Sequence, residues 1–227
     1  DDITNEEYAS FYKQRLGQSA YSILDNSCFE LGSSIPGDVL VRLYNEYFPT
    51  HLVLPDVMGD VEQTLALTKQ FLNDVKDIAG SERVKYMAVV QGKTYDEYVQ
   101  CWDFYNTIEQ IEVIGVNYRD LSDTTRWEFL CQMHLTNRIS KKIHLLGCNN
   151  PIEFKSYLEV PFRDSIMSVD TSSPIIHGWQ LTKYTENGIA FKPKGLLADN
   201  LDIELNAEQI ACINHNVTLF KQFVNAQ

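Results

Sequence analysis

Short apolar runs alternate with longer amphipathic segments along most of the chain. The runs are rich in Val, Ile and Leu, and their length is that of a buried strand rather than of a helix. Between them, apolar residues recur at helical spacing; in residues 38–48, for example, Val39, Leu43 and Tyr47 fall on one face. The pattern predicts strands at residues 21–24, 51–54, 86–90, 111–114, 143–146 and 165–169.

The segments between these strands are predicted to be helices. Alternation of strands and helices favours parallel strands covered by helices, and each strand with its helix takes roughly the 30 residues of one βα unit. The tail differs, because residues 185–202 are irregular and residues 206–224 have the pattern of a terminal helix. We expect one domain over residues 1–227, in which 185–227 form an irregular segment and a C-terminal helix. The other predicted helices are 5–16, 38–48, 61–79, 94–108, 123–140 and 151–158.

Two α/β folds fit this order of elements. A doubly wound open sheet usually has a glycine-rich loop after its first strand, whereas the sequence here is LDNSCFELG. We therefore expect a (β/α)8 barrel of the TIM type. Six predicted strands are two short of eight, so the barrel is incomplete in this sequence; the missing strands would lie upstream of Asp1 or in segments that the sequence lacks.

Each predicted strand ends at a polar residue or a glycine. In parallel α/β folds the carboxyl ends of the strands meet at one edge, where functional groups collect. A single aspartate in such a place more often caps a helix or shapes a turn, and we assign only the capping role to Asp60. Several acids at successive strand ends favour a site instead. The strand-end residues are Asp25, Asp56, Gln91, Gly115, Gly147 and Asp170.

Composition narrows the choice of partners. The net charge of −12 argues against extensive sequence-independent binding to nucleic acid, but it does not exclude local basic patches. The five cysteines form no CxxC pair, so neither a zinc site nor a disulfide framework is indicated. No run is long enough for a membrane helix and no secretion signal opens the sequence. We expect a cytoplasmic protein without cofactor or metal.

Six motifs, in order between residues 21 and 174, resemble those of the tRNA-guanine transglycosylases. ILDNSCFELG is similar to the family's ILDSGGFQ-type strand end, and VLPDVMGD to its second acidic strand end. MAVVQGKTYDEY resembles the VVQG segment, and VIGV stands where the family has a glycine-bearing strand end. KIHLLGCNNPIEF is close to HLLGxGxPxE, and SVDTSSP stands in the place of FDSxxPT. Together these motifs are far more specific than any one of them.

The resemblance implies a role for each matching residue. Asp170 would be the nucleophile that attacks C1′ of the sugar, and Asp25 the general acid and base or an anchor for the bound base. The other positions would bind the guanine-like base, through side chains at Asp56 and Gln91 and through backbone groups at the fourth strand end. His144 lies within a strand and is more often a packing residue than a site residue. The implied substrate-binding residues are Asp56, Gln91, Gly115, Val116 and Asn26.

The sequence departs from the family in three places. It has no CxCxxC…H zinc site, and SSPIIHGW replaces the arginine-rich stretch after the nucleophile. Asn26, Ser27 and Cys28 stand where a serine and two glycines are usual, which implies a bulkier pocket wall. Without the zinc module and the arginines, the chain looks more like the phage and bacterial members that insert 7-deazaguanines into DNA.

The implied chemistry suits these residue types. Breaking an N-glycosidic bond passes through an oxocarbenium-like transition state, which a carboxylate near C1′ stabilises and can trap covalently. A second carboxyl moves the proton of the departing and entering bases. A pocket that hydrogen-bonds guanine would reject adenine, because adenine would leave buried polar groups of the pocket without partners.

We therefore expect an enzyme that replaces guanine in DNA by a preQ0-like 7-deazaguanine. The alternatives are the same exchange on tRNA, a non-catalytic binding subunit, and an enzyme for free nucleosides. Its partners would be DNA or tRNA and a free 7-deazaguanine base, with no membrane, in the cytoplasm of a bacterium or of a phage-infected cell; it would be a monomer or an oligomer. Trp127 and Trp179 are candidates for base stacking, and Arg119 and Arg126 for phosphate contacts, with packing or surface roles as the alternatives.

Overall fold

A computed structural model describes residues 10–14, 21–117, 124–148, 151–189 and 204–225. The chain divides into two compact units. Unit 1 comprises residues 1–124 and 140–142, and unit 2 comprises residues 125–139 and 143–227. Each unit has its own strands and covering helices, so the two are described separately.

Unit 1 contains four parallel strands that follow one another in the sheet as they do in the chain. They are β1 (Ile23–Leu24), β2 (His51–Val53), β3 (Tyr86–Val90) and β4 (Ile111–Val116). Every residue of β2 and β3 is buried, which explains why these strands, apart from His51 at the start of β2, are continuous apolar runs instead of alternating. The parallel arrangement predicted from the alternation is confirmed in this unit.

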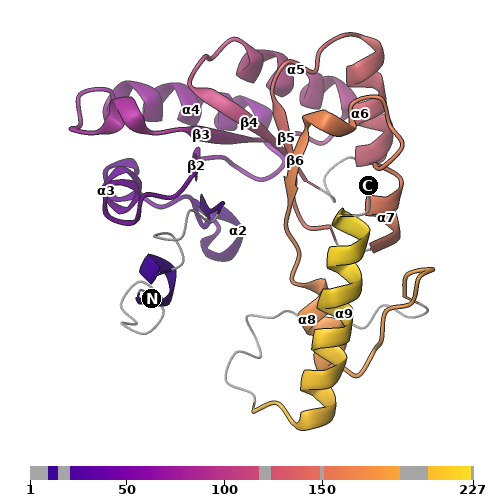
Figure 1. The fold of residues 1–227 in the computed structure, drawn as a ribbon. Coiled ribbons are helices and arrows are strands. Elements are labelled where there is room, and N and C mark those ends of the chain that lie inside the picture. The colour runs from indigo at the N-terminus through magenta and orange to yellow at the C-terminus, as the bar shows by residue number, and fades with distance from the viewer. Residues whose placement is uncertain (1–9, 15–20, 118–123, 149–150, 190–203, 226–227) are drawn as a thin grey trace. The chain divides into compact units, whose positions relative to one another are not determined.

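Helices connect these strands. They are α2 (Cys28–Leu31), α3 (Gly37–Tyr47), α4 (Val61–Val75) and α5 (Tyr95–Asn106), with a 3₁₀ turn, η2 (Ser81–Arg83), before β3. Helices α4 and α5 lie side by side, and α5 lies along β3 and β4 (Figure 1).

Side chains fix where two of these helices begin. The Asp60 carboxylate accepts the backbone N–H of Gln63 at 2.9 Å, which confirms its predicted role as the cap of α4. Helix α5 starts with a capping box formed by Thr94 and Glu97. Its large aromatic residues pack inward: Tyr98, Trp102 and Tyr105 are fully buried.

Unit 2 has one pair of parallel strands, β5 (Lys142–Leu145) and β6 (Ile166–Val169), whose register sets His144 opposite Ser168. The other described elements of this unit are four helices and one 3₁₀ turn, and the first helix, α6, is capped by Thr125. These elements are α6 (Arg126–Leu135), α7 (Pro151–Lys155), η3 (Arg163–Ser165), α8 (Ser173–Trp179) and α9 (Ala207–Asn225).

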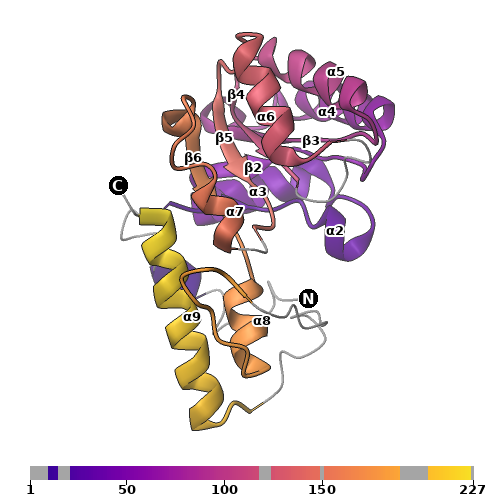
Figure 2. The ribbon, with the colours of Figure 1, turned by 90° about the vertical axis from the view of Figure 1, so that its right-hand side faces the viewer.

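Helices α8 and α9 lie against each other over most of the length of α8 (Figure 2). Asn216 on α9 is fully buried and binds the segment that follows α8: its Oδ1 accepts the N–H of Tyr184 at 2.8 Å, and its Nδ2 donates to the carbonyl of Thr182 at 2.9 Å. Gly178 permits the close approach, because a Cβ there would lie 2.5 Å from the Cα of Ile213.

We expect Gly178→Ala to lower the free energy of unfolding by about 1–3 kcal/mol, because the added methyl would meet backbone that cannot rotate away. Chemical denaturation would measure the loss. Ile175→Ala, at a position of the same helix that is 39% exposed, is the control and should change stability little. Equal losses in the two variants would contradict the proposed tight contact.

The fold is α/β, as predicted, and each of the six predicted runs overlaps a strand. The described residues contain six strands and not eight, so a complete barrel is not shown. The predicted helix 61–79 ends early, at Val75, and 123–140 shortens to Arg126–Leu135. Helices α2 and α8 were not predicted, and most of the predicted helix 5–16 lies outside the described residues. The single-domain assignment stays a prediction.

Candidate functional site

The strand ends of unit 1 bring together a group of polar side chains. Asp25 and Asn26 follow β1 directly, Asp56 lies just beyond β2, and Gln91 follows β3. The strands are parallel neighbours, so these residues share one edge of the sheet. The structure thus places Asn26, Asp56 and Gln91 in contact, while their roles toward a base stay predictions.

Asp56 is the centre of this group and is only 6% exposed. Asn26 Nδ2 donates to Asp56 Oδ1 at 2.8 Å and to the carbonyl of Leu54 at 2.6 Å. Gln91 Nε2 donates to the other carboxylate oxygen, Oδ2. Each oxygen therefore already has one amide partner and keeps a second lone pair, the capacity needed to accept the N–H groups of a purine.

Backbone groups hold the two amides in place. The N–H of Gly59 donates to Gln91 Oε1 at 3.0 Å, and the N–H of Cys28 donates to Asn26 Oδ1 at 2.8 Å. The Cys28 thiol lies 3.2 Å from the carbonyl oxygen of Asp56. Burial, followed by the charge of Asp56, raises the pKa of Cys28 to about 11, so this cysteine is a neutral thiol rather than a nucleophile.

The environment shifts the acidity of Asp56. Burial raises its pKa, and the hydrogen bonds from Asn26 and Gln91 lower it, with burial the larger effect, so the pKa lies above its ordinary value. The folded state therefore retains this proton to higher pH than the unfolded state does. The ionised form depends on its amide donors for stability.

We expect Asn26→Ala to lower the free energy of unfolding at pH 7 by about 1–3 kcal/mol, because the buried Asp56 carboxylate loses a donor. The loss should be smaller near pH 4, where Asp56 is more protonated: its pKa is raised, so the penalty develops as pH rises through that pKa. Urea denaturation at both pH values would measure this. Asn45→Ala is the matched control, because the Asn45 side chain makes an exposed 3.2 Å bond to the carbonyl of Ala79. A loss independent of pH would contradict the assignment.

Asp25 has a more open setting than Asp56. It is exposed, and its Oδ2 accepts the N–H of Ser27 at 3.0 Å, where Ser27 has a left-handed φ of 58°. The residue therefore shapes the turn into α2 and still presents its carboxyl group to solvent. Gly115 and Val116 lie within β4, opposite Val89 and Val90, rather than after the strand as predicted.

In unit 2, Asp170 directly follows β6 and is held by one carboxylate oxygen. The N–H of Gly147 donates to Asp170 Oδ1 at 2.8 Å, and His144 Nε2 lies 3.3 Å from the same oxygen. Among the described residues, Oδ2 has no hydrogen-bond partner, and the side chain is 57% exposed. The backbone is fixed as well, because Asp170 N–H donates to the carbonyl of Leu145 at 3.2 Å.

The surroundings of Asp170 favour its charged form. Burial of part of the group raises its pKa, but hydrogen bonds from His144 and Gly147 and the positive charges of His144 and Arg126 lower it further, so the pKa lies below its ordinary value. Asp170 is therefore a carboxylate over the whole neutral range. Acidification through this lowered pKa would remove the charge-assisted bonds.

Arg126 is buried, which makes its predicted surface or phosphate-binding role wrong. It is 3% exposed, its Nε and Nη2 donate to Glu153 Oε1 at 2.9 and 2.6 Å, and its Nη1 donates to the carbonyl of Leu146. That carbonyl and the N–H of Gly147 belong to one peptide group and point in opposite directions. Arg126 thus holds the carbonyl side of the peptide group whose N–H, that of Gly147, donates to Asp170.

Two features of the candidate site escaped the sequence analysis. His144 was assigned to packing, and the pairing of Arg126 with Glu153 was not foreseen. The motif HLLG carries a signal for the first: a histidine two residues before the end of a strand shares the strand-end edge with an acid on the next parallel strand. Of the other candidates, Trp127 is 40% exposed and donates to the carbonyl of Ser156, and Arg119 lies outside the described residues.

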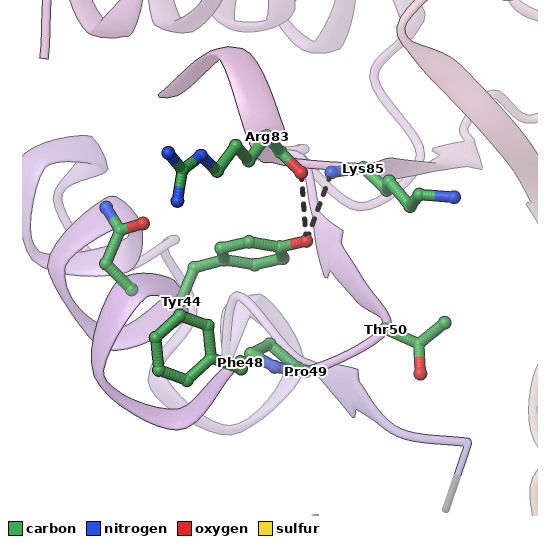
Figure 3. Close-up of a pocket in the computed structure, with 7 residues that line it drawn as sticks. Tyr44, Phe48, Pro49, Thr50, Arg83 and Lys85 are labelled. Atoms are coloured by element: carbon green, nitrogen blue, oxygen red, sulfur yellow. Dashed lines mark hydrogen bonds between the residues drawn. The ribbon is translucent and has the colours of Figure 1, made fainter. Parts of the chain in front are cut away.

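Unit 1 has two surface pockets outside the candidate site. One of about 310 Å³ lies beside the amino ends of β2 and β3, where the Tyr44 hydroxyl donates to the carbonyl of Arg83 at 3.2 Å and accepts from the N–H of Lys85 (Figure 3). Another of about 400 Å³ is lined by residues of α3 and α4 and the segments before them. Neither is lined by a predicted site residue.

Comparison with known proteins does not assign a family: no protein-family model matches the chain, and no curated protein matches it significantly. The resemblance to the transglycosylases therefore stays a prediction. Within the part of the chain that the structure describes, no helix is both long and apolar enough to cross a membrane. The same residues contain no cluster of three or more side chains suited to a metal ion.

Proposed function

We propose that the protein is a base-exchange transglycosylase that replaces guanine in DNA by a 7-deazaguanine through a covalent intermediate on Asp170. The observation that carries the proposal is the state of this carboxylate. One oxygen is held by two groups, the other has no partner among the described residues, and the pKa is lowered. A nucleophile for a sugar carbon needs an ionised, oriented and accessible oxygen.

The first half of the reaction uses Asp170 Oδ2. This oxygen attacks C1′ of the nucleotide as the C1′–N9 bond breaks, and the electron pair of that bond leaves with the guanine, which takes a proton from a carboxyl group. In the second half the entering base loses its N9 proton and attacks C1′, which releases Asp170. Two inversions at C1′ preserve its configuration, as a nucleic acid strand requires. Asp25, exposed after β1, is assigned the proton transfers.

Base recognition is assigned to the polar group of unit 1. The Asp56 oxygens each keep a lone pair beyond their amide bonds, so the carboxylate can accept from guanine N1–H and the exocyclic amine. Gln91 supplies a second amide beside it, and Gly115 and Val116 offer backbone groups on β4. A base lacking the matching donors would leave buried polar groups unpaired, which accounts for selectivity.

DNA is preferred to tRNA as the substrate because the chain lacks the zinc motif and the arginine-rich stretch described above. The target base must leave the stack to reach a carboxylate, at a cost of a few kcal/mol that a single-stranded substrate avoids. The acidic total charge predicts weak binding to DNA, because few basic side chains are available to neutralise its phosphates.

The test is to incubate the protein separately with DNA, with tRNA and with free deoxyguanosine, each with a radiolabelled 7-deazaguanine. Label that enters DNA and displaces an equal amount of guanine supports the proposal. Label in tRNA alone selects the tRNA enzyme, and label in the nucleoside alone selects an enzyme for free nucleosides. If label enters none of the three, the proposal of base exchange is contradicted.

A further inference from the structure

We propose that His144 is the positioning residue of Asp170: it holds the carboxylate by Oδ1 so that Oδ2 faces outward as the attacking oxygen. The inference rests on the proposed function for the meaning of that attack. The geometry of the pair stands without it, and the test below separates the two.

The imidazole ring of His144 is fixed at both nitrogens. His144 lies in β5 with its side chain 3% exposed, and the strand register sets it opposite Ser168, two residues before Asp170. Its Nδ1 lies 2.8 Å from Ser168 Oγ and its Nε2 lies 3.3 Å from Asp170 Oδ1. A buried ring bonded at both ends cannot turn without losing one of these contacts.

Two donors on one oxygen explain why the other oxygen is open. The N–H of Gly147 reaches the same Oδ1 at 2.8 Å, from the turn that follows β5. His144 and Gly147 therefore fix the carboxylate in direction as well as in place. Holding a reacting atom in one orientation removes part of the entropy cost of attack.

Ser168 lets this arrangement persist in both charge states of the ring. Its hydroxyl accepts from Nδ1 when that nitrogen carries a proton, and donates to Nδ1 when it does not. In both states Nε2 keeps its hydrogen toward Asp170. The ring therefore always donates to the carboxylate, with added positive charge when it is doubly protonated.

Several other ionisable groups of unit 2 act on the pair or on each other. Arg126 from α6 and Glu153 from α7 bind each other, and the Arg126 charge also lowers the pKa of Asp170. Burial raises the pKa of Cys148 to about 12 and also raises the pKa of Tyr157, so both groups are neutral near pH 7. Replacing His144 therefore leaves one other positive group, Arg126, acting on Asp170.

Two substitutions separate the contributions of the ring. His144→Phe keeps an aromatic ring in the buried position and removes both hydrogen bonds. His144→Gln keeps a neutral N–H donor that can reach the place of Nε2 and loses the possibility of charge. Titration of the Asp170 carboxyl carbon by NMR, in protein labelled with ¹³C-aspartate, reads the effect without any substrate. Asp170→Asn assigns the signal.

We expect Asp170 in His144→Phe to titrate at higher pH than in the native protein, with His144→Gln between the two. In the exchange assay, His144→Phe should lose at least about tenfold in rate at acid pH, with KM for the free base unchanged. The loss should shrink as pH rises, because Asp170 is then ionised in both proteins. A merely structural role would lower the rate equally at every pH.

Asp170 titrating at the same pH in the native protein and in His144→Phe would overturn the inference. If the phenylalanine variant does not fold, His144→Gln is judged by the same titration, and an unchanged value there would also overturn it. A shifted titration in a protein that exchanges no base would support the positioning role and refute the proposed function.

Discussion

Asp170→Ala should reduce the incorporation of labelled 7-deazaguanine by at least about 10³-fold, because removing the nucleophile of a double displacement leaves only binding and positioning. Asp170→Asn should be as inactive, although its amide oxygen can still accept the N–H of Gly147. The asparagine variant is the sharper test, since it keeps the shape and the backbone contacts of the residue and removes only the charge. Initial rates with saturating DNA and base would measure the loss.

A surface aspartate of the same unit provides the control. Asp164 lies in η3, is exposed, and is not assigned to the site, so Asp164→Ala should retain the native rate. Binding of the free base should survive in Asp170→Asn, because recognition is assigned to unit 1. An Asp170→Asn variant that still exchanges base at a tenth of the native rate or more would remove this residue from the mechanism.

Arg126→Met should lower the free energy of unfolding by about 3 kcal/mol, because it leaves the partly buried Glu153 carboxylate without its arginine partner. The substitution also frees the carbonyl of Leu146, so the peptide group that presents the Gly147 N–H to Asp170 loses its anchor. We therefore expect activity to fall even at temperatures where the variant is folded. Thermal and urea denaturation, followed by rate measurements below the melting temperature, would separate the two effects.

Two controls isolate the buried ion pair. The double substitution Arg126→Met with Glu153→Leu should recover part of the lost stability, since it removes the unpaired charge. Arg83→Met removes the partner of Glu82 in an ion pair whose side chains are 81% and 67% exposed, and should change stability little. A small loss in Arg126→Met, similar to that in Arg83→Met, would contradict the view that this pair holds the site.

The order of strands was predictable because each strand is a continuous apolar run, and such runs need only local information to recognise. Cap residues were also readable: the Asp60 carboxylate lies where its position before an amphipathic helix predicts. Helix α8 was missed because it is short and contains Gly178, a poor helix former; Pro174 lies in its first turn, where proline is tolerated. Its stability comes from packing against α9, which lies more than 25 residues later in the chain.

The sequence predicted which acidic residues lie in the candidate site but not which residues bind them. Strand-end position pointed to Asp56 and Gln91, and the structure shows them bonded to each other. The charge of Arg126 predicted an exposed side chain. The side chain is buried because it pairs with Glu153, which lies 27 positions later in the sequence. Sequence spacing does not record which distant charges pair, so burial of an arginine cannot be deduced from its neighbours alone.

The most direct test of the central claim is to find the covalent bond. The protein would be mixed with guanine-containing DNA in the absence of an entering base, quenched in acid within the first turnover and digested for peptide mass spectrometry. The account predicts deoxyribose-linked mass on the peptide that carries Asp170, and none in Asp170→Asn. An adduct on Asp25 instead, or base exchange with no adduct on any carboxylate, would contradict it.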